Sequence, residues 1–300
     1  MPQTKFTPVD PLPPKTFLEQ TLQLFLRNRL ATAGAIIIVI LIVLALVGPA
    51  LTPHDPLALD MDARLGPPSL QHPFGTDDFG RDVLSRVLSG ASVSLKVGVI
   101  AVSISMIIGT LLGAISGYYG RWVDEVIMRL MDVLFAFPAI LLAIAILAAL
   151  GPGISNAMIA IGIVYTPIFA RITRGSVLTV RQEVYVDAAE SIGCRDSRIL
   201  FRHILPNVVA PIIVETTLSL AFAILAEAAL SFLGLGTQPP DPSWGRMLSE
   251  SRAYIQDAPW LGIFPGLAIM VTVMGFNFLG DGLRDALDPR MKQVLEMKSE

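Results

Sequence analysis

The sequence has 300 residues, of which 53% are hydrophobic and only 16% are charged, and its mean hydropathy is +0.64. Soluble domains carry about 25% charged residues, so the composition argues against a soluble core and indicates a membrane protein. The net charge of −3 is uninformative as a total, and the lone cysteine, Cys194, excludes an intrachain disulfide.

The N-terminal residues are polar and of mixed charge, unlike a cleavable signal peptide, so the first apolar run is expected to remain as an anchor. Residues 17–30 precede this run. Their apolar positions come close to a helical stripe, with Arg27 and Arg29 near its end. The stripe predicts a helix lying at the cytoplasmic interface, and a simple extension of the first span is the alternative.

A helix needs about 20 apolar residues to cross about 30 Å of hydrocarbon. Six segments meet or approach this length, namely residues 31–51, 97–118, 133–150, 154–170, 208–230 and 260–280. Only turn residues separate the third segment from the fourth, which predicts a tight helical hairpin. The expected fold is therefore an all-α membrane protein with six transmembrane helices.

The distribution of Lys and Arg gives these spans a direction. With a cytoplasmic N-terminus, 16 of the 22 basic residues fall in cytoplasmic segments and five fall in outer segments. We therefore expect both termini to be cytoplasmic. The predicted divisions are a cytoplasmic or interfacial segment 1–30, the first span 31–51, a periplasmic loop 52–95, a membrane core 96–292 that includes the cytoplasmic loop 171–207, and a cytoplasmic tail 293–300.

The cytoplasmic loop contains the polar stretch DAAESIGCRDSRILFRHILP, residues 187–206. Residues 183–192 predict a short helix that ends near Gly193, and residues 196–204 predict a second helix with Asp196 or Ser197 as its N-cap. A short helix with a small apolar face and flanking arginines is typical of a docking element. The alternative is a solvated loop whose arginines only enforce the topology.

The same stretch resembles the EAA motif of membrane subunits of bacterial ABC importers. That motif is E-A-A, three residues, Gly, nine residues, Ile, one residue and Leu-Pro. Asp187 stands here in place of the glutamate and His203 takes the isoleucine position, while the spacing is intact. The residues that the resemblance assigns to an ATPase-coupling loop are Asp187, Ala188, Ala189, Gly193, Arg198, Arg202, His203, Leu205 and Pro206.

Three further stretches are similar to the second membrane subunit of dipeptide, oligopeptide and nickel importers. They are residues 72–95, 226–248 and 276–290, and the resemblance runs from about residue 20 to residue 292. The first stretch would belong to a periplasmic signature loop near a docked binding protein. The residues of this signature loop are Gly75, Thr76, Asp77, Gly80, Arg81 and Asp82.

This resemblance implies the type I ABC importer membrane-subunit fold, in the bacterial cytoplasmic (inner) membrane. It implies as partners a second homologous permease subunit, two ATPase subunits or domains, and a periplasmic or lipid-anchored binding protein. Peptides are the expected substrates, with nickel chelates or glutathione as alternatives, and no nucleic-acid partner is expected. The chain itself would be non-catalytic and bind no cofactor, and ATP and magnesium would be bound by the partner ATPases.

The residues support no nucleotide site in this chain. GTDDFGRD, residues 75–82, has two glycines at P-loop spacing, but Arg81-Asp82 stands where Lys-Ser/Thr is needed. The three histidines, His54, His72 and His203, match no metal-ligand spacing, so no metal site is predicted.

Two acids, Glu215 and Glu227, fall in the fifth span, where a charge costs roughly 2.5–3.5 kcal/mol at mid-membrane. Either could line a translocation path, or each could be wetted or bonded to a neighbour on its helix. A stand-alone ion-coupled transporter would require more membrane-embedded charges and inverted repeats. An intramembrane serine protease would require a histidine at membrane depth, and none is predicted there.

Overall fold

The computed structural model describes residues 17–287, where regular structure is helical apart from an isolated bridge between Thr76 and Asp82. Predictions for residues 1–16 and 288–300 lie outside the described residues. The longer helices are α1 (Phe17–Arg27), α2 (Arg29–Leu51), α3 (Val83–Tyr119), α4 (Arg121–Phe135), α5 (Ala139–Leu150), α6 (Ile154–Val180), α7 (Val184–Ser191), α9 (Val209–Phe232), α10 (Trp244–Ser251) and α11 (Trp260–Leu287). The short helical turns are η1 (Met61–Ala63), α8 (Asp196–Arg198), the π-helical turn η2 (Ile199–Ile204), η3 (Leu205–Asn207) and η4 (Arg252–Tyr254).

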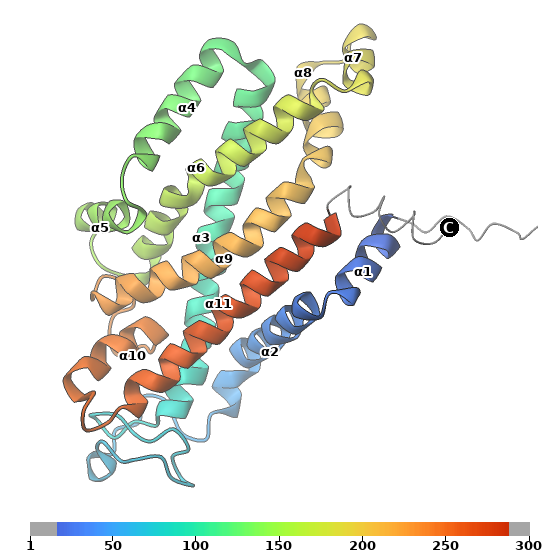
Figure 1. The fold of residues 1–300 in the computed structure, drawn as a ribbon. Helices are drawn as coiled ribbons and strands as arrows, with labels where there is room; N and C mark the ends of the chain where they lie inside the picture. The colour runs from blue at the N-terminus through green and yellow to red at the C-terminus, as the bar shows by residue number, and fades with distance from the viewer. Residues whose placement is uncertain (1–16, 288–300) are drawn as a thin grey trace, which may run out of the picture.

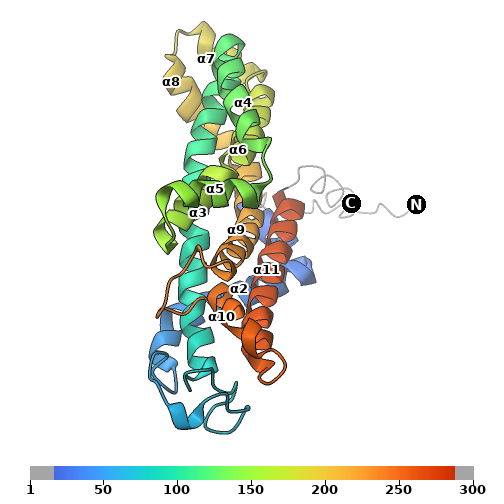
Figure 2. The ribbon, with the colours of Figure 1, turned by 90° about the vertical axis from the view of Figure 1, so that its left-hand side faces the viewer.

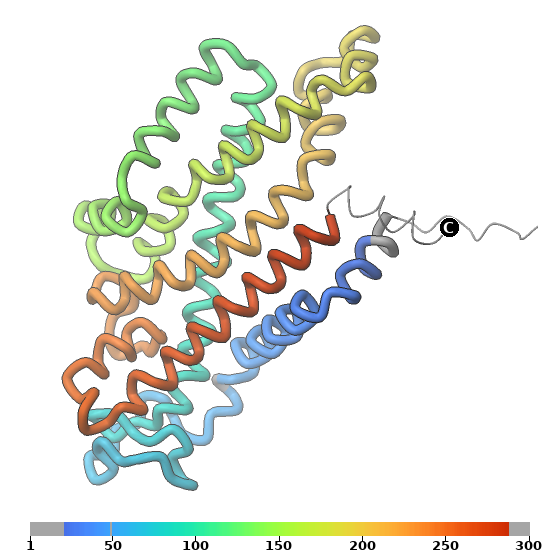
Figure 3. The backbone as a smooth tube through the Cα atoms, viewed as in Figure 1, coloured from blue at the N-terminus to red at the C-terminus, as the bar shows by residue number. Residues whose placement is uncertain are grey.

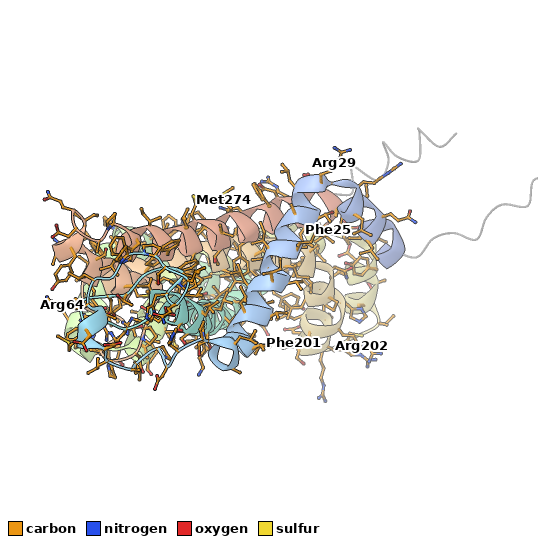
Figure 4. All side chains as sticks on the ribbon, turned by 90° about the horizontal axis from the view of Figure 1, so that it is seen from below. Phe25, Arg29, Arg64, Phe201, Arg202 and Met274 are labelled. Atoms are coloured by element: carbon orange, nitrogen blue, oxygen red, sulfur yellow. The ribbon has the colours of Figure 1, made fainter. Side chains whose placement is uncertain are left out.

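The molecule is elongated, with long helices running between two ends (Figures 1 and 2). We call residues 52–82 the connecting segment, because they join α2 to α3. This segment and α10 lie at one end, and α7 and α8 lie at the other. Figure 4 looks at the molecule from below, from the end of the connecting segment, and Arg64 of that segment and Arg202 of η2 are also set apart sideways in this view.

Five helices, α2, α3, α6, α9 and α11, are long and apolar enough to cross a membrane, and a bent pair can supply a sixth span. The prediction of one helix over residues 133–150 is wrong. The chain turns by 93° between α4 and α5, as the tube in Figure 3 shows. Pro138 is the N-cap of α5, and proline disfavours helical backbone at the residue before it, so the helix breaks there.

Three of the predicted spans are parts of clearly longer helices, and one of them, predicted to end at residue 280, continues to Leu287. The helix predicted from residue 97 begins at Val83, where the Asp82 carboxylate caps it by accepting from the Ser85 amide at 2.8 Å. The helix predicted to end at residue 170 continues to Val180. Hydropathy detects only the apolar part of a helix, so it missed these polar extensions.

The most extensive helix–helix contact in the core joins α3 to α6, and glycines on α3 allow these two helices to pack closely. A Cβ at Gly109 would lie 2.6 Å from the Thr166 carbonyl oxygen, and one at Gly113 would overlap the Ala170 carbonyl oxygen. Small residues at four-residue spacing allow membrane helices to approach backbone to backbone. The pair α3 and α6 therefore forms a closely packed centre, against which α9 also lies.

The N-terminal stripe forms a helix of its own. The backbone at Asn28 is extended, and the Asn28 side chain caps α2 by accepting from the amides of Leu30 and Ala31. Helix α1 is therefore separate from α2, and the alternative of a simple extension is wrong. Phe25 of α1 lies beside α11, where a Cβ at Gly282 would be 3.3 Å from its ring (Figure 4).

Candidate functional site

Helix α7 carries an exposed apolar face at its end of the molecule. Val184 of α7 and Ile192, the C-cap residue that directly follows α7, are each 80% exposed, and the exposed Ala188 lies between them at helical spacing. Gly193 follows with φ +78°, a left-handed conformation that suits glycine, and it ends α7 sharply. The described chain leaves this face uncovered, so it is available to a partner.

The opposite side of α7 is fixed to the core. Val186 is fully buried and Ala189 is nearly so, and both pack with Ile199, Leu200 and Ile204 of η2 in the cluster that holds α3 and α6. The apolar residues of the segment predicted as a second helix are thus buried. Since η2 leads directly through η3 into α9, a force applied to α7 would reach the long helices through packed side chains.

The polar residues of the predicted coupling loop point mostly to solvent. Asp187, Arg198, Arg202 and Pro206 are exposed, whereas His203 and Leu205 are partly covered. The face presented by α7 is therefore apolar at its centre and has arginines on the adjoining turns.

The predicted N-cap at Asp196 or Ser197 is wrong. Arg195 occupies the cap position and makes no side-chain cap bond, while the Asp196 carboxylate accepts from the Tyr118 hydroxyl at 3.2 Å. Arg181 donates to the Tyr118 backbone carbonyl at 2.5 Å. Tyr118 and Arg181 thus tie the loop to the end of α3, and nothing in their local sequence indicates this role.

Glu227 is fully buried inside the chain and belongs to a network of hydroxyl groups. It accepts from Ser231 at 2.7 Å, from Ser94 of α3 at 3.3 Å and from Thr237 at 3.4 Å. Such a carboxylate joins α9 to α3 and to the turn after α9. This burial fits the structural alternative for Glu227 better than a place on a translocation path.

Glu215 is only partly buried, and it accepts from Ser219 one helical turn along α9 at 2.9 Å. Bonding to a neighbour on its own helix is the second of the two predicted alternatives. The two acids lie three turns apart on α9 and share no hydrogen-bond partner in the described residues.

The predicted signature loop forms a buried ionic cluster with α3 and α10. Arg81 contacts Asp77 at 2.6 Å, Arg86 contacts the same carboxylate at 3.5 Å, and Glu250 of α10 lies 3.2 Å from Arg86. Burial, reinforced by the neighbouring Asp77 carboxylate, raises the pKa of Asp78. The cluster fixes the connecting segment to both helices, and the sequence did not indicate the part of Glu250.

The remaining signature residues shape the loop backbone. Gly80 has φ +74°, and a Cβ there would collide with the Asp60 carbonyl, so only glycine fits. Thr76 accepts from the Gly66 amide at 2.8 Å, and its own carbonyl accepts from the Trp260 indole at 3.2 Å. These contacts make the loop an ordered element that is joined to the start of α11.

The connecting segment also brings two histidines to Asp82, which the sequence spacing did not predict. The His72 Nδ1 atom lies 3.0 Å from Asp82 Oδ1, and the His54 Nδ1 atom lies 3.9 Å from the same oxygen. His203 lies in η2, at the α7 end.

Comparisons with known proteins place these features in a family context. Residues 109–293 match the family model described as binding-protein-dependent transport system inner membrane component. Residues 16–68 match the N-terminal TM domain of oligopeptide transport permease C.

Two curated relatives are similar over most of their length. The dipeptide transport system permease protein DppC of Alkalihalophilus pseudofirmus is 51% identical, over 97% of this chain and 94% of the relative. The glutathione transport system permease protein GsiD of Escherichia coli is 50% identical, over 89% of each chain.

Solved structures show the same helical arrangement at low identity. A chain of the inward-facing MetNI methionine ABC transporter has a TM-score of 0.56 and 15% identity, covering 68% of this chain and 97% of that chain. A chain of an amino acid ABC transporter with histidines has a TM-score of 0.52 and 18% identity. The match covers 65% of this chain and 91% of that chain. At these identities the likeness concerns the fold alone.

Proposed function

Because this chain belongs to the family of binding-protein-dependent transport system inner membrane components, we propose that it forms half of the translocation pathway of an ATP-driven importer of short peptides. The chain is a multi-pass protein of the cytoplasmic membrane and has the type I ABC importer membrane-subunit fold. Its relatives are named for dipeptide and glutathione transport, and both substrates are short peptides. The alternative substrate is a nickel chelate, imported by the same machinery, and a transport assay must distinguish it from peptides.

The observation that carries the proposal is the uncovered apolar face of α7, formed by Val184, Ala188 and Ile192. An apolar helix face that its own chain does not cover suits insertion into a groove on a partner. The buried side of α7 packs on the helices of the core, so movement of the partner would be passed to them as a rigid-body switch. The partner in this proposal is an ATPase subunit, which binds ATP and magnesium.

The proposal also sets the direction of the chain. The α7 end faces the cytoplasm, together with both termini, and the connecting segment faces the periplasm. The excess of basic residues on the α7 side supports this direction. A binding protein would dock at the connecting segment and α10, and a second permease subunit would complete the pathway.

An apolar cavity of about 220 Å³ is a better candidate for part of the peptide path than Glu215 and Glu227 are. It lies between α5, α6 and α9, and its lining includes Ala143, Tyr165 and Phe222. Walls of this kind offer few polar contacts, so they would pass different side chains without binding any of them strongly. Selection among peptides would then fall to the binding protein.

The test is purification of the tagged chain at native expression level, followed by reconstitution in liposomes. We expect a second permease subunit and ATPase chains to co-purify, and uptake of a labelled dipeptide to require ATP and the binding protein. Recovery of the chain alone, with solute uptake driven by an ion gradient, would show a stand-alone secondary transporter instead. ATP-dependent uptake of a nickel chelate but not of peptides would overturn the substrate class.

A further inference from the structure

His54, His72 and Asp82 form a compact cluster at the N-terminus of α3. One nitrogen from each imidazole and one carboxylate oxygen of Asp82 all lie within 4.8 Å of one another. The imidazole rings are 4.6 Å apart between centroids and tilted by 32°. The three residues are separated by up to 28 positions, so the cluster exists only because the connecting segment folds back on itself.

The cluster has the fixed geometry of a built site. Asp82 is buried, and its Oδ2 atom accepts from the Ser85 amide at 2.8 Å and from the Ser85 hydroxyl at 2.7 Å. The Ser85 hydroxyl oxygen in turn accepts from the His54 amide at 3.3 Å. Hydrogen bonds of this kind orient the groups that bind a metal and fix which oxygen is offered. Here they leave Oδ1 directed at the two imidazoles.

The charge at this position also favours a cation. The Asp82 side chain has no exposed surface, and its ion-pair partners within residues 17–287 are the two histidines. Arg81 is adjacent in sequence but makes its ion pairs with other acids, including Asp77 and Glu250. A buried carboxylate is costly unless it is paired with a charge, and a bound divalent cation would supply that charge.

We propose that His54, His72 and Asp82 bind a divalent transition metal of the zinc type. Imidazole nitrogen and carboxylate oxygen are common zinc ligands, at about 2.0–2.2 Å, and tetrahedral ligands at that length lie about 3.4 Å apart. The distances from Asp82 Oδ1 to the Nδ1 atoms of His72 and His54, 3.0 Å and 3.9 Å, lie on either side of this value. The His54 side chain is 42% exposed, so solvent can supply a fourth ligand and the metal has an entry route.

The metal would link the start, the middle and the end of the connecting segment. His54 lies just after α2, His72 lies further along, and Asp82 is the last residue of the segment and caps α3. A shared ion would hold the connecting segment against α3. The site concerns the stability of that surface, and it stands or falls independently of the peptide substrate.

The experiment uses the full-length chain, purified through a tag without histidines and stripped with a chelator. Zn²⁺ is titrated in competition with a chromogenic chelator, and Co²⁺ is added separately to record its visible absorption. We expect one Zn²⁺ per chain with a dissociation constant below 10 μM, as an order of magnitude, and a rise in Tm on binding. His54→Gln and His72→Gln should each weaken binding at least about tenfold and remove the Co²⁺ spectrum.

His203→Gln is the matched control, because His203 lies at the other end of the molecule, and it should leave binding unchanged. If His72→Gln fails to fold, His54→Gln decides the question, because the His54 ring is exposed and lies beyond hydrogen-bond distance from Asp82. The highest Zn²⁺ concentration tested is 100 μM, about tenfold above the expected dissociation constant. If no Zn²⁺ binds at that concentration, the proposal is overturned. Binding that neither histidine substitution weakens would overturn it equally.

Discussion

The Arg86 guanidinium of α3 donates to the Glu250 carboxylate of α10 at 3.2 Å, although the two residues are 164 positions apart. Arg86 is 1% exposed, and the Pro56 carbonyl and the Asp77 carboxylate are its other partners. One side chain therefore connects α3, α10 and the connecting segment. The surface proposed to receive a binding protein depends on this contact for its shape.

Glu250→Gln should destabilise the protein by about 1.5–3 kcal/mol, because it removes a charged partner from a buried guanidinium. The measurement is Tm of the purified protein in detergent. Glu125→Gln is the matched control, since Glu125 pairs with Arg129 at an exposed site and such pairs contribute at most about 1 kcal/mol. Equal losses of Tm in the two variants would contradict the structural role of the buried cluster.

Gly113→Leu should separate α3 from α6, because a side chain there would overlap the Ala170 backbone, which cannot move aside. Overpacking of this kind costs about 1–3 kcal/mol or more, so the yield of monodisperse protein and its Tm should both fall. Gly175→Leu on α6 provides the comparison, because no atom lies within 4 Å of a Cβ added there. A normal yield and Tm for Gly113→Leu would mean that the two helices pack less closely than described.

Gly193→Trp should reduce ATP-driven peptide uptake at least about tenfold without preventing insertion. The indole would project beside the exposed face of α7, and the position has open space around it. Gly193→Ala is the control for backbone strain, because any residue with a Cβ at φ +78° costs about 1–2 kcal/mol. A loss of uptake in Gly193→Trp beyond that in Gly193→Ala is due to the bulk of the indole. The readouts are peptide uptake and ATP hydrolysis in proteoliposomes.

Arg198→Glu on the adjoining turn should also uncouple uptake, by reversing a charge beside the same face. Here the comparison is Arg129→Glu on α4, which also reverses an exposed arginine. Uptake at the wild-type rate by Gly193→Trp and Arg198→Glu, with the ATPase still bound, would remove α7 from the coupling contact.

Glu227→Gln should leave peptide uptake unchanged, because an amide can bond to the surrounding hydroxyl groups in place of the carboxylate. Glu227→Leu should instead lower Tm, since Ser231, Thr237 and Ser94 would lose an acceptor in a buried place. Uptake is measured at matched expression. Strongly reduced uptake by the glutamine variant, with an unchanged Tm, would place Glu227 on the peptide path after all.

Apolar runs were sufficient to predict the long helices, because lipid imposes a length and a hydropathy on any span. The bend at Pro138 escaped prediction although proline was its local signal, since the run from residue 133 to residue 150 is apolar on both sides of it. The resemblance to importer subunits assigned residues 187–206 to a coupling loop, and that role stays a prediction. Its exposed and buried faces depend on packing between α7 and η2, which only the folded chain shows.

Long-range polar contacts were the least predictable part. Asp196 was expected to cap a helix, but Tyr118 at the end of α3 competes for its carboxylate. Glu250 and Asp82 likewise obtain their partners from segments that are distant in sequence. Local propensity contains no information about such partners, so a spacing rule alone finds neither the ionic cluster nor the pair of histidines.

The length of α3 sets how far the protein stands out from the bilayer. Its 37 residues extend about 55 Å at 1.5 Å per residue, whereas the hydrocarbon is about 30 Å thick. Lys96 is exposed on α3, and the stretch from Val83 to Lys96 accounts for about 20 Å of that length along the helix axis. This reach exceeds the depth of the lipid headgroups. In the orientation proposed above, with the bilayer edge near Lys96, a soluble protein arriving at α10 and the connecting segment would therefore meet them in water.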